Sequence, residues 1–472
     1  MRNLKPFLIS IATLAGLAVA APAAKHDKRS LVKKAGVVYN VFEHAATGAR
    51  IEFVNNSGIC ETTPGVKQYS GYLSVGENMN MWFWFFEARQ NPSTAPLAAW
   101  FNGGPGCSSM IGLFQENGPC KFEVGSEHTT PINNTLSFSN YANMIYVDQP
   151  IGVGFSYGNN QVNSTKTAAP YVWNLIQAFY SSFPEYKSRD FGIFTESYGG
   201  HYGPEFAKYI QDQNKATVGE PINIVALGVN NGWHDAEIQE PAYVSFSYNN
   251  SHKSIINKTQ HDQYRVDFND YCLPDIQQCA QTGVDLDCQN AESICYYTVE
   301  RPLYNAADYD VYDVRAPSNN PEPPSNYVQY LQRAYVMKAI GAQSTYQECP
   351  NAPYNKFALT GDGPRSFLNE LSGVVASGIT TLIWAGDADW ICNWYGVHDV
   401  ANAIQYPGQN VFAGKFLTPY KVNGKEGGSF KTEGNLSFLR VYEAGHEVMY
   451  YQPELSLQVF IQTMSKGAIH ST

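Results

Sequence analysis

The 472-residue sequence lacks the features that identify several large classes of protein. Its net charge is −11 and no basic stripe stands out, which argues against a nucleic-acid partner. After the N-terminal segment no apolar run is long enough to cross a membrane, and the last residues show neither a retention signal nor an anchor tail. Internal repeats and coiled-coil heptads are also absent. We therefore expect a globular protein without a membrane anchor.

Metal-site spacing is missing as well. Four of the nine cysteines cluster in a polar, turn-rich segment without a Cys-x-x-Cys pair or a neighbouring histidine: Cys272, Cys279, Cys288 and Cys295. This spacing favours two local disulfides over metal ligation, which is the competing interpretation. Because nine is odd, an oxidising compartment predicts four disulfides and one free thiol. We expect no metal and no organic cofactor.

The N-terminus has the pattern of a targeting segment. A basic start is followed by apolar residues 7–20, which end in the small-residue cleavage site Ala-Val-Ala. We predict a signal peptide at 1–20 and a short pro-segment at 21–29 that ends at the dibasic pair Lys28-Arg29. A secreted protein is expected, with the vacuolar lumen as the alternative. Six candidate glycosylation sites agree with this route: Asn55, Asn133, Asn163, Asn249, Asn257 and Asn435.

Short β-rich apolar runs alternate with helix-like stretches along the chain. The predicted strands cover 96–101, 143–147, 191–195, 222–229, 380–384 and 437–441, and helices are expected at 167–180 and 202–213. This alternation predicts an α/β fold with a mostly parallel sheet covered by helices on both faces. Residues 66–86 are expected to form antiparallel strands instead.

A change of composition divides the chain. Residues 235–341 are richer in Asn, Gln, Tyr and Pro and contain the four clustered cysteines. We predict that 235–341 is an insertion that caps the sheet. The core of the fold would then consist of 30–234 and 342–472.

A serine follows one predicted strand in the segment 195–200, TESYGG. A sharp strand-to-helix turn would expose the Ser197 hydroxyl to a base, and the two glycines would let the next helix pack closely. Thr195 stands where the usual nucleophile turn has glycine. A helix N-cap is the alternative role for this serine.

Two more polar loops follow predicted strands. One contains Asp387 and Asp389, and the other contains His446. Catalytic groups in α/β sheets lie at the carboxyl ends of the strands, and the order Ser, Asp, His is that of the α/β-hydrolase triad. His446 would take the serine proton, and an aspartate would orient the imidazole. Each loop alone could be a capped turn, but three such loops in this order argue against that alternative.

The segment 102–109, NGGPGCSS, also follows a strand. Its glycine pair would allow the backbone to approach a substrate with its N–H groups exposed. We predict an oxyanion hole formed by the N–H groups of Gly104 and Tyr198. A plain Gly/Pro turn is the alternative, whereas a phosphate loop is disfavoured because no lysine follows.

Together these motifs resemble the serine carboxypeptidase family, in particular its fungal secreted and vacuolar members of the carboxypeptidase Y type. The resemblance extends from about Gln68 to the His446 loop and is carried by segments 100–109, 148–157, 196–200, 386–389 and 445–446. It implies an α/β-hydrolase fold and places the triad acid at Asp389 rather than Asp387. The implied activity releases single C-terminal residues from peptides and proteins through an acyl-enzyme.

The resemblance also implies how a chain end is recognised. Its members bind the free carboxylate at positions that correspond to Trp100, Asn102, Glu116 and Glu196. Two neighbouring carboxyl groups resist ionising together, so one keeps a proton in acid and can donate a hydrogen bond to that carboxylate. We therefore expect activity at acidic pH. Solvated surface charge is the alternative for both glutamates.

One position departs from the family pattern. Glu447 stands where many members have methionine in the pocket for the leaving residue. An acid there would favour lysine or arginine as the leaving residue. The alternative is that Glu447 faces solvent or pairs internally.

The remaining expectations concern the cysteines and rival functions. The resemblance implies Cys392 as the free thiol near the site and the pairs Cys107–Cys349, Cys272–Cys295, Cys279–Cys288 and Cys60–Cys120. An esterase or acyltransferase of this fold should lose the carboxylate-binding set, and a silent binding homologue should lose triad members. Both sets are present. The expected partners are peptide and protein C-termini, and the chain is expected to be a monomer or a homodimer.

Overall fold

The structure is a computed structural model that describes residues 27–45, 48–122, 130–319, 323 and 325–472. The predicted signal peptide and residues 21–26 of the predicted pro-segment lie outside the described residues. Lys28 and Arg29, at the end of that pro-segment, begin strand β1, which pairs with β2 in antiparallel register.

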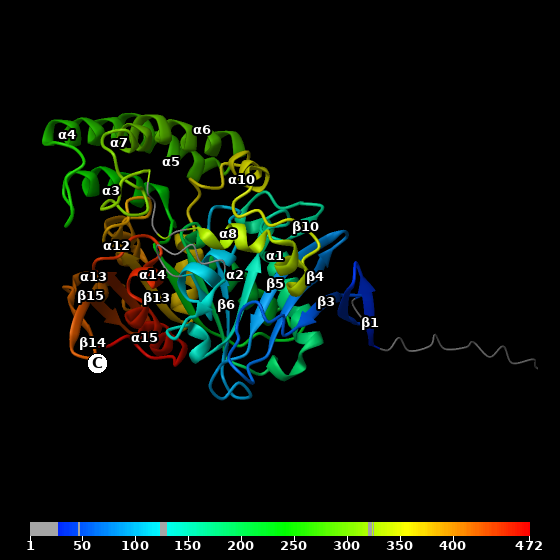
Figure 1. Cartoon of the computed structure of the whole chain (residues 1–472). Coiled ribbons are helices and arrows are strands. Elements are labelled where there is room, and N and C mark those ends of the chain that lie inside the picture. Colours follow the sequence, from blue (N-terminus) through cyan, green and yellow to red (C-terminus); the bar gives the residue numbers. More distant parts are fainter. Residues whose placement is uncertain (1–26, 46–47, 123–129, 320–322, 324) are drawn as a thin grey trace, which may run out of the picture.

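A mixed sheet of 14 strands organises the fold (Figure 1). The strand order is β1-β2-β3-β4-β5-β9-β6-β11-β12-β13-β16-β15-β14, with β10 beside β5, and the stretch from β9 to β16 is parallel. The strands are β1 (Lys28–Lys34), β2 (Val37–Glu43), β3 (Arg50–Asn55), β4 (Gln68–Gly76), β5 (Met79–Phe86), β6 (Leu97–Phe101), β9 (Asn143–Asp148), β10 (Tyr157–Gly158), β11 (Phe191–Glu196), β12 (Ile224–Asn230), β13 (Thr380–Gly386), β14 (Thr418–Val422), β15 (Lys425–Glu433) and β16 (Leu436–Val441); β7 (Cys120–Lys121) and β8 (Ile132–Asn133) form a separate pair.

Helices cover both faces of this sheet. They are α1 (Thr165–Ser182), α2 (Gly199–Lys215), α3 (Ala236–Tyr248), α4 (Lys258–Asp267), α5 (Leu273–Thr282), α6 (Asp285–Cys295), α7 (Arg301–Tyr304), α8 (Asn326–Leu331), α9 (Ala334–Ile340), α10 (Asn351–Ala358), α11 (Leu368–Ala376), α12 (Trp394–Ala403), α13 (Gln409–Gly414), α14 (Val448–Tyr451) and α15 (Pro453–Met464). Short turns of other helix types are η1 (Gly112–Glu116), η2 (Phe138–Asn140), η3 (Pro184–Tyr186), η4 (Phe268–Cys272) and η5 (Tyr296–Glu300).

The strand sequences explain this arrangement. Successive side chains of a strand point to opposite faces, so a strand buried on both sides must be apolar throughout. In β6, Leu97, Ala99 and Phe101 pack on the face covered by α1 and α2, whereas Ala98 and Trp100 pack on the face covered by η1 and α15. The predicted strands and both predicted helices are found, and residues 66–86 form the antiparallel pair β4–β5. The expected α/β architecture is therefore confirmed, with its parallel part confined to the centre of the sheet.

The predicted insertion contains two groups of helices. Helices α3 to α7 extend beyond the carboxyl ends of the central strands (Figure 1) and share a third core with Trp390. The disulfides Cys272–Cys295 and Cys279–Cys288 join η4, α5 and α6 within this group. Helices α8 and α9 instead pack against the core beside β5 and η1. We call α3–α7 the cap below.

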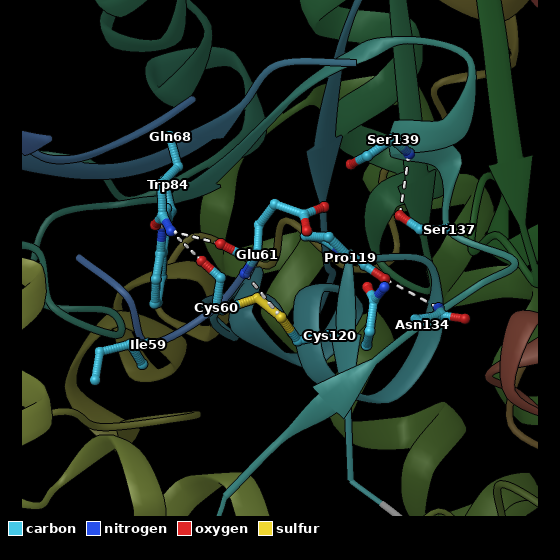
Figure 2. Close-up of a disulfide and its surroundings, with 12 residues drawn as sticks. Ile59, Cys60, Glu61, Gln68, Trp84, Pro119, Cys120, Asn134, Ser137 and Ser139 are labelled. Atoms are coloured by element: carbon cyan, nitrogen blue, oxygen red, sulfur yellow. Dashed lines mark hydrogen bonds between the residues drawn. A yellow bond between two sulfur atoms is a disulfide. The ribbon is translucent and has the colours of Figure 1, made fainter. Parts of the chain in front are cut away.

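A disulfide and an arginine side chain connect the two loops that contain Cys60 and Cys120. Cys60 is bonded to Cys120, Trp84 Nε1 donates to Gln68 Oε1 over 3.0 Å, and the Gln68 amide donates to the Cys60 carbonyl (Figure 2). The Arg89 guanidinium reaches the same loops and donates to Glu61 Oε2 over 2.8 Å and to the Pro119 carbonyl over 3.0 Å. The Glu61 side chain is fully buried and that of Arg89 is 10% exposed.

We predict that Arg89→Met destabilises the fold by about 3 kcal/mol, because it leaves the Glu61 carboxylate buried without its cation. Urea unfolding at constant pH measures this loss. Arg189→Met is the matched control, since Arg189 makes one exposed hydrogen bond to the Glu185 carbonyl, and it should change stability by less than about 0.5 kcal/mol. A loss below about 1 kcal/mol for Arg89→Met would contradict the prediction.

Candidate active site

Ser197 occupies a strained turn between β11 and α2. Its backbone has φ +63°, in the left-handed region that non-glycine residues rarely adopt. The turn needs both following glycines, because a Cβ at Gly199 would lie 2.5 Å from Thr195 Cβ and one at Gly200 would lie 2.4 Å from the Trp233 carbonyl oxygen. The N-cap of α2 is Tyr198. Ser197 is therefore not the cap of this helix.

Asp389 and His446 meet at the ends of β13 and β16. His446 Nδ1 lies 2.9 Å from Asp389 Oδ2, and both side chains are buried. The other ring nitrogen of His446, Nε2, lies 3.9 Å from Oε1 of Glu196, the residue before Ser197. Asp387 is placed differently: it binds His252 and Arg440 and takes no part in this pair. The structure thus brings Asp389 and His446 together and leaves Asp387 outside this pair.

Two positioning residues were not anticipated from the sequence. Asn231, directly after β12, donates through Nδ2 to Asp389 Oδ2 over 2.8 Å and accepts from the Gly386 N–H through Oδ1. The Tyr312 ring lies against the His446 imidazole with ring centroids 5.0 Å apart, and the Tyr312 backbone carbonyl accepts a hydrogen bond from the His446 backbone N–H. Asn230 and Asn231 are two polar residues at the end of a buried strand, and this sequence pattern could have indicated Asn231 as a site residue. Nothing in the local sequence marks Tyr312.

The glycine-rich loop after β6 passes directly against the nucleophile turn. A Cβ at Gly103 would lie 2.3 Å from the Tyr198 backbone nitrogen, so only glycine allows this approach. Gly104 follows with φ +111°. The disulfide Cys107–Cys349 ties the same loop to the segment before α10. The backbone N–H groups of Gly104 and Tyr198 are thus on adjacent segments beside Ser197.

The predicted carboxylate-binding residues form one buried network. Asn102 Oδ1 accepts from Trp100 Nε1 over 2.7 Å and from the Gly112 N–H over 2.9 Å, which fixes the orientation of the amide. Asn102 Nδ2 then donates to Glu116 Oε1 over 3.0 Å and to Glu196 Oε1 over 3.1 Å. The second oxygen of each glutamate is buried without a partner. Neither glutamate is a solvated surface charge.

Burial dominates the electrostatics of this network. It raises the pKa of Glu116 to about 7, although hydrogen bonds from Glu196 and Asn102 lower it. Burial and then the charge of Glu116 raise the pKa of Glu196 well above its ordinary value. Glu116 and Glu196 therefore hold protons in acid. For His446, burial lowers the pKa, whereas the carboxylates of Asp389, Glu196 and Glu447 raise it. The contributions of Glu196 and Glu447 vanish where these groups hold their protons, so in acid the imidazole loses its proton more readily than it would in the fully ionised site.

Glu447 is half-buried beside His446. Its Oε2 is buried without a hydrogen-bond partner. Burial and the neighbouring Glu196 raise its pKa well above the ordinary value. It stands at the start of α14, whose residues Met449 and Tyr450 line a pocket of about 490 Å³ together with Glu116. Glu447 itself is not part of that lining.

The cysteines are distributed as the resemblance implies. The four expected disulfides are present, and Cys392 is a buried free thiol. Cys392 lines the same pocket as Ser197, and burial raises the pKa of this thiol well above its ordinary value. Cys392 is therefore a neutral neighbour of the nucleophile.

Five of the six candidate glycosylation sites are exposed: Asn55, Asn133, Asn163, Asn249 and Asn257. Asn435 is half-buried, and its Nδ2 donates to the carbonyls of Val375 and Ile379 over 2.9 and 2.6 Å. Because a glycan would be attached to this nitrogen, the contacts oppose modification of Asn435. In the described part of the chain, no helix combines the length and the apolar character required to cross a membrane.

The comparisons with known proteins agree with this geometry. The family model described as serine carboxypeptidase matches residues 58–466. The chain is 65% identical to carboxypeptidase S1 of Penicillium janthinellum over 425 residues, which cover 89% of this chain and 100% of that protein. It is 37% identical to carboxypeptidase Y homolog A of Talaromyces stipitatus over 409 residues, 84% of this chain and 72% of that protein.

A solved structure shows the same fold. The prohormone-processing carboxypeptidase Kex1(delta)p of Saccharomyces cerevisiae superposes with a TM-score of 0.73 at 22% identity, covering 86% of this chain and 91% of that chain. At this identity the likeness concerns the fold, and the family assignment comes from the sequence matches. The chain therefore belongs to the serine carboxypeptidase family and has the α/β-hydrolase fold.

Proposed function

We propose that this serine carboxypeptidase releases single C-terminal residues from peptides and proteins at acidic pH, with Ser197, His446 and Asp389 as its catalytic triad. The observation that carries the proposal is the fixed amide of Asn102, which donates to two buried carboxyl groups, those of Glu116 and of Glu196, the residue before Ser197. A site of this kind recognises a free carboxylate and places it next to the nucleophile. An esterase or acyltransferase has no need for it.

The chemistry follows from the positions of the triad. His446 Nε2 takes the proton of the Ser197 hydroxyl as its oxygen attacks the carbonyl carbon, while Asp389 orients the imidazole through Nδ1. The N–H groups of Gly104 and Tyr198 stabilise the oxyanion. The C–N bond breaks, the proton passes from His446 to the departing amine, and an acyl-serine remains. Water then repeats the sequence and releases the shortened peptide.

The acidic pH range follows from the shared proton of Glu116 and Glu196. A protonated carboxyl donates a hydrogen bond to the substrate carboxylate, whereas two ionised carboxyls repel it. The titratable groups that interact with the pair are Glu447 and Tyr146, which act on Glu116, and His446 and Cys392, which act on Glu196. Loss of the proton near pH 7 should therefore weaken binding of free-acid substrates.

For Glu447 we propose a role in the choice of the leaving residue. It lies beside Glu196 and next to the residues that line the pocket beyond Glu116. Once ionised, this carboxyl would attract lysine or arginine as the leaving residue. Because its pKa is raised, the attraction should grow as the pH rises.

For the cellular route we propose secretion, with the vacuolar lumen as the alternative. Four disulfides agree with an oxidising compartment. We further propose glycosylation at the five exposed sites, removal of residues 1–20, and processing after Arg29. The oligomeric state is proposed as monomer or homodimer.

The first prediction concerns the reaction itself. At about pH 4.5 the enzyme should shorten a free-acid peptide stepwise and act much more weakly on its C-terminal amide, because the amide cannot use the Asn102 site. Ser197→Ala should lower the rate by at least about 10³-fold. Mass spectrometry of the peptide ladder measures both. Internal cleavage, or ester hydrolysis without peptide shortening, would favour the esterase or acyltransferase instead.

The second prediction concerns pH. For a free-acid peptide, kcat/KM should be highest in acid and fall as the pH rises through about 7, by up to about tenfold per pH unit. An ester whose leaving group carries no carboxylate should not show this fall. Glu116→Gln, whose amide donates at every pH, should make the fall shallower. Constant kcat/KM for the free acid from about pH 4 to 8 would contradict the prediction.

The third prediction concerns Glu447. Glu447→Gln should reduce the preference for leaving lysine over leaving leucine by about fivefold near pH 7 and have less effect near pH 4.5. Competing peptides that differ only in the last residue give this ratio. The control is Glu454→Gln, which changes an exposed glutamate on α15. An unchanged ratio for Glu447→Gln would remove the proposed role.

A further inference from the structure

The first aspartate of the segment 386–389 is buried but has no place in the proposed triad. Asp387 directly follows β13 and is 3% exposed. It lines a pocket of about 520 Å³, whose described lining residues differ from those of the pockets at Ser197 and at Glu116. A buried carboxylate away from the substrate must have its role in the contacts it makes within the chain.

Four hydrogen-bond donors from three segments meet at the Asp387 carboxylate. Oδ1 accepts from His252 Nε2 over 2.9 Å and from the Glu443 backbone N–H over 3.0 Å. Oδ2 accepts from Arg440 Nη2 over 2.9 Å and from Ser251 Oγ over 3.4 Å. Ser251 and His252 lie between α3 and α4 of the cap, Arg440 belongs to β16, and Glu443 begins the loop of the catalytic histidine. One carboxylate therefore joins the cap, the sheet and that loop.

The chain itself supplies the cation for this buried charge. Burial alone would raise the pKa of Asp387, but His252 and Arg440 outweigh burial and lower the pKa. The Arg440 guanidinium lies over the rings of Trp394 and Tyr442, 4.2 and 5.1 Å from their centroids, which limits its movement. Hydrogen bonds to an ionised carboxylate are stronger than those between neutral groups. The Glu443 N–H is therefore bound to a charged acceptor that is held in place.

The backbone of Glu443 is strained at the point where Asp387 binds it. Its φ is +53°, in the left-handed region that non-glycine residues keep only when the surrounding structure imposes it. The hydrogen bond from its N–H to Asp387 Oδ1 is such a constraint. The loop then passes close to the end of β13, since a Cβ at Gly386 would lie 2.1 Å from the Gly445 carbonyl oxygen. A change at Glu443 would therefore move His446, three residues later.

The position of His446 decides the rate of the proposed reaction. A misplacement of a catalytic group by about 1 Å can cost about 10²-fold in rate. We propose that Asp387 is a positioning residue that holds Glu443 in its left-handed conformation and thereby sets the place of His446. The inference rests on the proposed function, in which His446 is the general base. It gives Asp387 a role in the reaction without contact with the substrate.

The first experiment removes the charge. In Asp387→Asn the amide NH₂ faces one pair of the four donors, so the carboxylate contacts cannot all persist. With a free-acid peptide at about pH 4.5, kcat should fall by about tenfold or more and KM should change by less than about threefold. Rates are divided by the concentration of serine sites titrated to completion with a fluorophosphonate, so unfolded enzyme does not count. The matched control is Asp262→Asn, which alters an exposed aspartate on α4 that also binds a lysine and a histidine and should leave kcat unchanged.

A second substitution separates positioning from a general loss of stability. Glycine adopts the left-handed region without strain, so Glu443→Gly should raise the kcat of Asp387→Asn by about fivefold or more. Glu443→Ala removes the same side chain, including its ion pair with Arg315, but keeps the Cβ that causes the strain. In the Asp387→Asn enzyme it should raise kcat by less than about twofold.

The outcomes distinguish this inference from the proposed function. A kcat for Asp387→Asn within about twofold of wild type would overturn the inference and leave the proposed function intact. A lowered kcat that Glu443→Gly does not restore would also overturn it, as would equal restoration by Glu443→Ala, because the backbone conformation would then not be the cause. If the wild-type enzyme releases no C-terminal residue, the proposed function itself is refuted.

Discussion

The hydrogen-bonded register of the parallel strands is the constraint on which the site depends. Thr195 pairs with Phe101, Glu196 with Asn230, Asn230 with Trp384, and Gly386 with Val441, so five strands end at one level. The Gly-rich loop, Ser197, Asn231, Asp389 and His446 all follow within a few residues of these strand ends. A slip of one residue in any strand would turn its side chains to the opposite face and separate the groups. The sheet therefore fixes the relative positions of these residues, and the loops supply the polar and reactive side chains.

Much of this could be predicted from the sequence because strand ends and motifs are local. The strands around Ser197, the paired hairpin strands and the positions of the Asp389 and His446 loops follow from apolar runs that end in polar residues. Thr195 occupies a position where the usual nucleophile turn has glycine, and the structure accommodates its side chain. Its hydroxyl donates to the Gly199 carbonyl over 2.9 Å, and its Cβ fits because residue 199 has no side chain.

The remainder depends on contacts between distant segments, which no local pattern records. Asn231 becomes a partner of Asp389 only when β12 and β13 are neighbours, and Tyr312, in the segment after the cap, contacts His446 from 134 positions earlier in the sequence. Glu240, Glu292 and Glu300 likewise come from three elements, α3, α6 and η5, and meet in the lining of one pocket. The separation of α8 and α9 from the cap likewise reflects packing partners elsewhere in the chain.

The buried acids have a consequence for the whole molecule. In an unfolded chain, glutamates such as Glu116, Glu292 and Glu300 would ionise near their ordinary pKa of about 4.3, whereas in the fold their pKa is about 7. Folding therefore takes up protons between these two values. The contribution of these groups to stability is complete below about pH 4.3 and is lost as the pH rises through 7. In thermodynamic terms the proton is a ligand of the native state, and these groups favour the folded protein in an acidic medium.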